Sequence, residues 1–165
     1  MNKLVDLVIP TLKKSHSKIC HEYLIHFPFV GERHLISDGK NWPEAINIGL
    51  SKTGKDSDIV LMDDDIFLMP NTFSLIPTHY EDADIFGFKL LFPNGLLQHA
   101  GGIFRGGSVG HRFFLEPDNG QADTVCYLAH VTTSLIYIKR KVFDAIGGMA
   151  TDYPGEQMED VDFCL

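Results

Sequence analysis

Residues 58–69, DIVLMDDDIFLM, contain the transition from which the fold can be predicted. The apolar run Ile59–Met62 is short and continuous, which is typical of a strand buried on both faces of a sheet. It ends on three consecutive carboxylates, Asp63–Asp65, and apolar residues then resume at once. Like charges this close raise one another's pKa values, so they need either a cation or open water beside them. The apolar flanks favour burial, and the stretch therefore predicts a cation site at the carboxyl end of a buried strand.

The chemistry of that site follows from its ligands. Hard carboxylate oxygens suit Mg²⁺ or Mn²⁺, ions that commonly carry the phosphates of a substrate. An acidic turn that caps a helix starting near Pro70 is the alternative, because short motifs of this kind also recur by chance. We favour the metal–diphosphate site.

The length and charge of the chain limit its class. A chain of 165 residues is expected to form one domain with a sizeable core. Its 14 Lys and Arg stand against 22 Asp and Glu, a formal net charge of -8. Broad binding to nucleic acid or to an anionic membrane needs a basic face, so we expect neither. One anionic ligand held through a bound metal stays compatible with this charge.

The cysteines and the apolar runs indicate where in the cell the protein is expected. Cys20, Cys126 and Cys164 are scattered, so they indicate neither a zinc site nor a disulfide framework. Reduced thiols and a cytoplasmic location are the expectation. No apolar run approaches the ~20 residues of a membrane span, and the first residues are typical of a strand rather than of a signal peptide. We therefore expect no transmembrane segment.

In the first half of the chain, short apolar runs typical of buried strands alternate with segments that have the apolar spacing of helices. This pattern predicts strands at Leu4–Ile9, Arg33–Ser37 and Ile59–Met62, with helices at Lys13–Phe27 and Trp42–Leu50 between them. This alternation is typical of a doubly wound α/β sheet, whose ligands lie outside the carboxyl ends of the strands.

Polar residues follow all three predicted strands. Thr11, Asp38 and the Asp63–Asp65 cluster stand at these ends, so they are expected to meet at one edge of the sheet. Asp38 precedes Gly39 and could be only a turn residue, or it could accept a hydrogen bond from a nucleobase or ribose. Asn47, within a predicted helix, could satisfy a backbone group or orient the ligand loops.

The second half predicts different structure. Asp84–Leu91 is expected to be one strand, Phe92–Gly95 a turn, and Leu96–Ala100 the hairpin partner. In the glycine-rich region that follows, His99 and His111 are expected to be structural or to contact an acceptor. A late strand at Val131–Ile138 and a helix at Lys139–Ile146, capped by glycine, complete the prediction.

Glu159, Asp160 and Asp162 form a second acidic group near the end of the sequence. Acids in a first helical turn are stabilised by the helix dipole, and this alone would explain them. Beside a metal–diphosphate site, one of them becomes a candidate general base that takes a proton from an acceptor hydroxyl.

Short motifs along nearly the whole chain carry a family resemblance. In order they are LVDLVIPT, HLISDG, EAINIGL, DIVLMDDDI, GLLQHAGG and SLIYIKRKVFDAIGGM, followed by MEDVDFCL. Together they resemble the family 2 inverting glycosyltransferases with a GT-A fold. The resemblance implies a single Rossmann-like α/β domain over residues 1–165, with a mixed, mostly parallel central sheet flanked by helices. Residues 1–70 would form the nucleotide-binding half and residues 71–165 the acceptor-binding half.

The resemblance also implies roles for individual residues. Those expected along the nucleotide are Pro10, Thr11, Asp38, Asn47, Asp63 and Asp64. Asp65, with Asp63, would hold Mn²⁺ or Mg²⁺ against the diphosphate. Asp160 would be the general base, with Glu159 as its rival. His99, Gly101 and Gly102 would lie at the acceptor or donor sugar.

The implied activity is transfer of a hexosyl or deoxyhexosyl group from a UDP- or GDP-type sugar to a hydroxyl of a glycan. Two features depart from the family pattern: Ile46-Asn47 stands where many relatives carry Arg-Asn, and the sequence ends soon after its last motif. A truncated chain, a minimal enzyme and a domain that needs a partner all stay open. A non-catalytic nucleotide-sugar-binding module is the alternative function. A metal-dependent nucleotidyltransferase ranks last, because few Lys or Arg stand at the predicted strand ends to grip a triphosphate.

Overall fold

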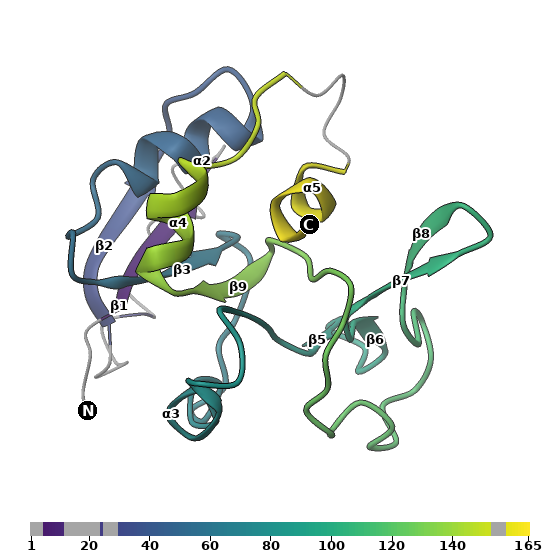
Figure 1. Cartoon of the computed structure of the whole chain (residues 1–165). Coiled ribbons are helices and arrows are strands. Elements are labelled where there is room, and N and C mark those ends of the chain that lie inside the picture. Colours follow the sequence, from purple (N-terminus) through teal and green to yellow (C-terminus); the bar gives the residue numbers. More distant parts are fainter. Residues whose placement is uncertain (1–4, 12–23, 25–29, 153–157) are drawn as a thin grey trace.

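A computed structural model describes residues 5–11, 24, 30–152 and 158–165 of the chain (Figure 1). The predicted helix at Lys13–Phe27 lies outside these residues, apart from Leu24, which is helical and buried. No helix in the described part of the chain is long and apolar enough to cross a membrane.

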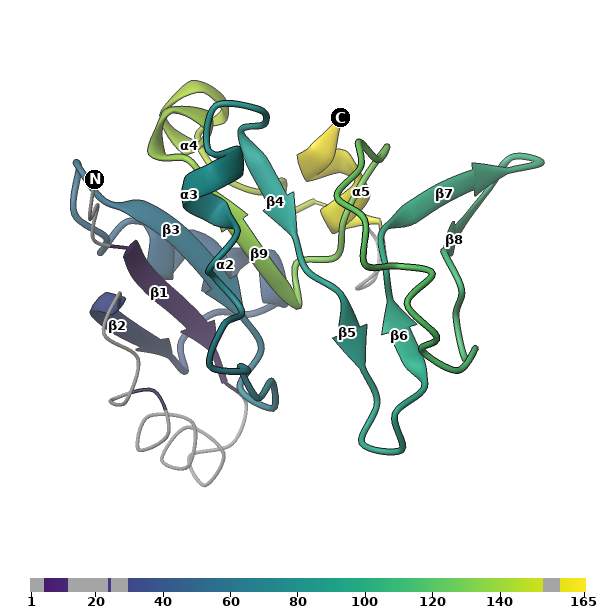
Figure 2. The same cartoon turned by 90° about the horizontal axis from the view of Figure 1, so that it is seen from below.

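A five-stranded sheet forms the centre of the structure, in the order β2-β1-β3-β9-β4 (Figure 2). Its strands are β1 (Val5–Pro10), β2 (Val30–Ile36), β3 (Asp58–Met62), β4 (Ile85–Gly87) and β9 (Leu135–Ile138). β1 pairs in parallel with β2 and β3, whereas β9 runs antiparallel to both β3 and β4. The mixed α/β class with a mainly parallel central sheet is therefore confirmed.

Alternate residues of the central strands are buried on opposite faces of this sheet. Leu7 and Val60 belong to one apolar cluster, which α3 (Ile76–His79) covers. Val8 and Ile59 belong to the other, beneath α2 (Trp42–Leu50) and α4 (Arg140–Ile146) (Figure 1). Because side chains alternate across a strand, burial on both faces explains the continuous apolar runs of the sequence.

The bounds of α2 agree with the prediction. The Asn41 side chain caps the helix by accepting a hydrogen bond from the Glu44 N–H at 2.9 Å, and Glu44 accepts one from the Lys40 N–H at 2.6 Å. Gly49 allows the helix to approach the sheet closely, since a Cβ there would lie 2.3 Å from Val8 Cγ1. These contacts hold the start of α2 at the carboxyl edge of β2.

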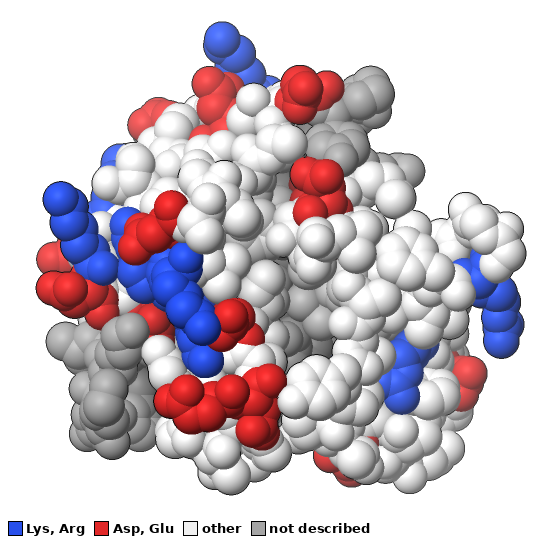
Figure 3. Space-filling view, in the orientation of Figure 1, with Lys and Arg blue, Asp and Glu red and all other residues white. Residues whose placement is uncertain are grey.

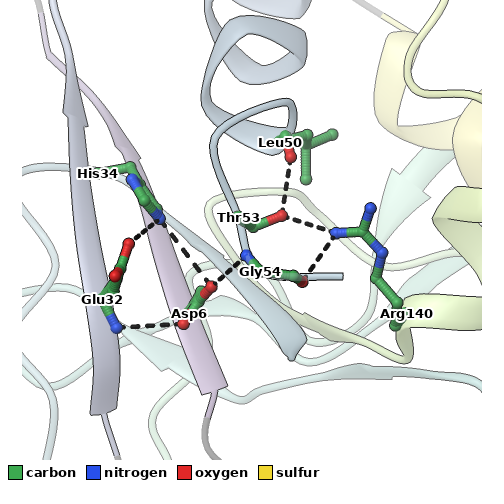
Figure 4. A network of polar contacts seen from close by, with 7 residues as sticks. All are labelled: Asp6, Glu32, His34, Leu50, Thr53, Gly54 and Arg140. Atoms are coloured by element: carbon green, nitrogen blue, oxygen red, sulfur yellow. Dashed lines mark hydrogen bonds and ion pairs between the residues drawn. The ribbon is translucent and has the colours of Figure 1, made fainter. Parts of the chain in front are cut away.

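The buried acid of β1 joins several elements at the opposite edge of the sheet (Figure 4). Asp6 accepts hydrogen bonds from the Glu32 N–H at 3.1 Å and from the Gly54 N–H at 2.8 Å. Arg140 of α4 donates to the Thr53 hydroxyl at 2.8 Å and to the Gly54 carbonyl at 3.2 Å. At the amino edge of the sheet, charged and polar side chains thus bond one another and the backbone, and so join these elements.

The second half of the chain departs from the prediction in the bounds of its strands. Asp84–Leu91 is not one strand: β4 ends at Gly87, and β5 (Leu90–Leu91) belongs to a separate sheet with β6 (Leu97–His99). The alternative interpretation of the acidic stretch, a cap for a helix that starts near Pro70, is wrong, because residues 70–75 form turns and α3 begins only at Ile76. In one of these turns the Thr72 N–H and hydroxyl both bond Met69.

Other predicted elements are present. The hairpin of β5 and β6 is antiparallel, and the Gly95 N–H donates to the Phe92 carbonyl at 2.9 Å in its turn. The helix predicted from Lys139 begins at Arg140 and ends on Gly147, whose φ of 78° provides the left-handed cap. The late strand is shorter than predicted, because the residues before Leu135 enter the site instead.

Two further elements complete the described chain. The ribbon of β7 (Gly102–Arg105) and β8 (Ser108–His111) extends away from the central sheet (Figure 1). The last helix, α5 (Glu159–Cys164), lies beside the amino-terminal end of β9 (Figure 1).

Candidate active site

A cavity of about 640 Å³ lies at the carboxyl edge of the central sheet. Its walls come from the ends of β1, β2 and β3, the start of α2, the segment before β9, the end of β8 and the first turn of α5. Six residues predicted for the site line it: Pro10, Thr11, Asp38, Asp63, Glu159 and Asp160. Strand ends that are distant in sequence therefore meet, as expected for a doubly wound sheet.

Asp63 is the acid of the triple cluster that reaches the cavity. Its N–H donates to the Ser134 carbonyl at 2.9 Å, which anchors it to the segment before β9. Its Oδ1 is buried and has no hydrogen-bond partner among the described residues. Burial raises the pKa of Asp63 to about 6, with smaller contributions from Asp65 and Asp64 and an opposing hydrogen bond from Ser134. A buried, unpaired carboxylate oxygen is costly, so this position favours a cation or a proton.

The other two acids of the cluster differ from Asp63 in their surroundings. Asp64 accepts a hydrogen bond from the Thr11 hydroxyl, which joins the ends of β1 and β3. Asp65 is exposed, and neither side chain is among the described residues that line the cavity.

The described acids form no complete metal site of their own. Within the described ranges, no three His, Cys, Asp or Glu side chains are close enough together to hold a metal ion by themselves. Mg²⁺ usually needs only one or two carboxylates, since substrate phosphates and water complete its shell. Asp63, whose Oδ1 has no partner among the described residues, supplies one such carboxylate, and Asp65 is exposed two residues on.

The first turn of α5 forms another part of the cavity wall. Asp160 accepts a hydrogen bond from the Val161 N–H at 2.8 Å through Oδ1. Glu159 Oε2 is buried and has no hydrogen-bond partner among the residues that the structure describes. An acidic cluster lies at the position of α5 on the surface, whereas Lys and Arg, with acids among them, gather over α4 (Figure 3). The cavity is therefore lined by acids from the end of β3 and from the first turn of α5.

The structure places the other predicted site residues outside the cavity lining. Asn47 bonds the backbone of Met149 with both polar atoms of its side chain. His99 contacts His111, which does line the cavity: the Nδ1 atoms of the two rings are 2.6 Å apart. Gly102 packs against the ring of His130, whose Nε2 would be 1.9 Å from a Cβ at this position. Gly101 lines a second cavity of about 780 Å³, which His130 also lines.

Several residues that line the cavity were not predicted for the site. They include Lys40 and Trp42 after β2, and His130, Thr132, Thr133 and Ser134 before β9. His111, which was expected to be structural or to contact an acceptor, lines the cavity at the end of β8. The Thr-Thr-Ser run before an apolar strand was the available signal. It points to the site only once β9 is known to be antiparallel, because its amino end then lies at the carboxyl edge of β3.

Comparisons with known proteins address the fold. No protein-family model matches the chain. Over 86 residues it is 37% identical to the uncharacterized protein y4gI of Sinorhizobium fredii, a match that takes in 48% of this chain and 9% of that protein. The chain thus spans only a small part of this curated relative.

Two solved structures are similar over nearly the whole chain. The catalytic domain of Drosophila beta1,4galactosyltransferase 7, in complex with xylobiose, matches with a TM-score of 0.55 at 14% identity, over 98% of this chain and 59% of that one. A197 from STIV matches with a TM-score of 0.63 at 14% identity, over 98% and 76% of the two chains. At this identity the similarity shows the fold alone, which resembles that of a glycosyltransferase catalytic domain.

Proposed function

We propose that the chain is a metal-dependent inverting glycosyltransferase, which moves a sugar from a nucleoside diphosphate to an acceptor hydroxyl. One observation carries the proposal: in a glycosyltransferase-like fold, Asp63, whose Oδ1 has no partner among the described residues, lines the same cavity as the acids Glu159 and Asp160. A donor and an acceptor fit between these acids, with the leaving group on one side and a base on the other.

The donor is assigned to the wall built by the first three strands. Pro10, Thr11 and Asp38 stand at the nucleotide, Asp63 and Asp64 at the ribose and diphosphate. Asp63 and Asp65 would hold Mg²⁺ or Mn²⁺, which when bound neutralises charge on the departing diphosphate. The raised pKa of Asp63 supports this assignment, because a site that disfavours a bare carboxylate gains from a cation.

The acceptor is assigned to the α5 wall. Asp160 takes the proton of the acceptor hydroxyl while the hydroxyl oxygen forms its bond to the anomeric carbon. The bond between that carbon and the diphosphate oxygen breaks at the opposite face, and the electron pair leaves with the diphosphate. Attack and departure on opposite faces invert the anomeric centre without a covalent enzyme intermediate. Glu159 is the second candidate for the base.

A non-catalytic nucleotide-sugar-binding module is the second candidate function. It is favoured by Asp160, one of whose oxygens already accepts a hydrogen bond from the Val161 N–H. A nucleotidyltransferase ranks below both, since Lys40 is the only Lys or Arg among the described residues that line the cavity.

Melting temperatures with uridine and guanosine diphosphates and their sugars, with and without Mn²⁺, identify the donor, because a ligand of the folded state raises the melting temperature. Transfer to sugar acceptors is then measured with the best donor. D160N is expected to lose transfer by ~10²- to ~10⁴-fold and to keep donor affinity. An equal loss in E159Q alone would move the base to Glu159. Donor binding without transfer to any acceptor tested would favour the binding module.

A further inference from the structure

Two histidines of the β5–β8 region form a hydrogen-bonded pair at the edge of the cavity. His99 of β6 is 2% exposed, whereas His111 at the end of β8 is exposed and lines the cavity. Their Nδ1 atoms are 2.6 Å apart, and the rings meet edge to face with centroids 4.9 Å apart. One Nδ1 must therefore donate a proton and the other must accept it.

A backbone group decides which nitrogen donates. The Thr132 N–H lies 3.2 Å from His99 Nε2, and a backbone N–H can only donate. His99 Nε2 is therefore an acceptor, and the one proton of a neutral His99 is on Nδ1. Burial lowers the pKa of His99 to about 4, with further lowering by His111 and His130, so the ring is neutral at pH 7. The pair is then ordered: His99 Nδ1–H donates and His111 Nδ1 accepts.

This order determines what His111 can offer to a ligand. A neutral His111 that accepts at Nδ1 carries its proton on Nε2. No other described residue forms a hydrogen bond with Nε2. A protonated Nε2 has no lone pair for a metal or for a proton, so in this state it can only donate a hydrogen bond.

We propose that His111 donates a hydrogen bond from Nε2 to an oxygen of the ligand in the cavity, and that His99 is the positioning residue that fixes this tautomer. The inference rests on the proposed function and adds a residue to it. The oxygen acceptor is either a diphosphate oxygen or a sugar hydroxyl, which offer the same chemistry to an N–H donor.

The pair is also connected to the acidic wall. Thr132, which orients His99, is two residues from Ser134, and the Thr132 hydroxyl lies 3.4 Å from both the Ser134 N–H and the Ser134 hydroxyl. Ser134 in turn bonds Asp63. One short segment before β9 thus contacts both His99 and Asp63.

The tautomer is tested without any ligand, by long-range ¹⁵N–¹H correlation spectra of the imidazole rings at pH 7. The expected result is Nδ1–H for His99 and Nε2–H for His111. H99N keeps an amide donor near the position of Nδ1 and should preserve the His111 signal, whereas H99Q places its amide at the other end and should mix the tautomers. A wild-type His111 protonated on Nδ1 would overturn the assignment.

The ligand contact is tested by calorimetry with uridine and guanosine diphosphates and their sugars in the presence of Mn²⁺. H111L should weaken binding by about 10-fold or more, and H111Q, which keeps an N–H near Nε2, by less than about 3-fold. Equal losses for the diphosphate and its sugar would indicate a phosphate oxygen, and a loss confined to the sugar nucleotide would indicate a hydroxyl. Wild-type affinity of H111L for every ligand would overturn the contact.

The two measurements separate this inference from the proposed function. If the wild-type protein binds none of these ligands, the proposed function and the ligand contact fail together. The imidazole spectra still decide the tautomers in that case. If the wild-type protein binds a ligand and H111L binds it equally well, the proposed function stands and the inference fails.

Discussion

The side chain of Asn47 makes both of its hydrogen bonds to the backbone of Met149. Nδ2 donates to the Met149 carbonyl at 2.8 Å, and Oδ1 accepts from the Met149 N–H at 2.8 Å. This pair joins α2 to the segment after α4 although the residues are far apart in sequence. Gly148 lets the backbone approach, since a Cβ there would lie 2.5 Å from Asn47 Oδ1.

N47A should therefore lower the free energy of unfolding by about 1–3 kcal/mol, because it leaves two buried backbone groups without partners. Urea unfolding measures this. N71A is the control, since Asn71 is exposed in a turn, and it should change stability by less than about 0.5 kcal/mol. Folded N47A should bind nucleoside diphosphates as the wild type does. A large loss of nucleotide affinity in folded N47A would instead support a direct role at the ligand.

Tyr137 donates a hydrogen bond to the fully buried Asp58 at 2.6 Å. The Arg140 N–H and the Tyr80 hydroxyl also donate to this carboxylate, at 3.0 and 2.9 Å. Burial and the bond to Asp58 raise the pKa of Tyr137, so its hydroxyl remains a donor throughout the neutral range.

Y137F should cost about 1.5–3 kcal/mol of stability in chemical denaturation, the range for a hydrogen bond to a charged group. Y127F makes the same chemical change at a side chain that is 83% exposed and that, among the described residues, bonds the Asp82 carbonyl alone, at 3.2 Å. It should be neutral within about 0.5 kcal/mol. Equal effects of the two substitutions would show that the Asp58 cluster does not stabilise the fold.

The raised pKa of Asp63 predicts a pH-dependent stability. Between about pH 4 and about pH 6 the folded protein keeps a proton on Asp63 that the unfolded chain has released. Stability contributed by this group is thus complete at low pH and is lost as the pH rises through that window. D63N removes the loss, so its stability relative to the wild type should rise by about 2 kcal/mol from pH 4 to pH 7.

Denaturation of D63N and the wild type across this pH range measures the difference. D56N, which changes an exposed acid in the loop before β3, should follow the wild-type profile. Parallel profiles for D63N and the wild type would mean that Asp63 is not buried unpaired in the folded protein.

Gly102 and Gly110 are two glycines of the β7–β8 ribbon that differ in the space around them. A Cβ on Gly102 would lie 1.9 Å from Nε2 of the His130 ring, whereas the nearest atom to a Cβ on Gly110 is Ile103 Cγ1 at 4.0 Å. G102A must displace His130 from the cavity wall and should cost about 1–3 kcal/mol, together with ligand affinity. G110A should be tolerated in thermal unfolding and in ligand titration. A neutral G102A would indicate that the His130 ring moves freely.

The elements that could be predicted from the sequence are those in which the spacing of apolar residues agrees with the faces that are buried. Trp42–Leu50 has a capping Asn, an early Pro and an apolar face, and its bounds agree with α2. The buried runs of β1 and β3 were equally clear. The ends of these strands place Thr11, Asp38 and Asp63 at one cavity, because parallel strands end at the same edge.

Features that depend on tertiary pairing were not predictable in this way. The apolar run Asp84–Leu91 gives no sign that the chain changes sheets between Gly87 and Leu90. The sequence also gives no sign that β9 runs antiparallel to β3. Without that direction, the Thr132–Ser134 segment could not be assigned to the site. The three acids Asp63–Asp65 were predicted as one group, yet backbone geometry directs Asp63 to the cavity and Asp64 to Thr11.

Diffraction at the manganese absorption edge, from crystals soaked with Mn²⁺ and a uridine or guanosine diphosphate, tests the proposed function most directly. The proposal predicts an anomalous peak within coordination distance of Asp63 or Asp65, with the diphosphate in the same cavity. Bound nucleotide at another location, or an Asp63 carboxylate without a metal beside a bound nucleotide, would contradict it.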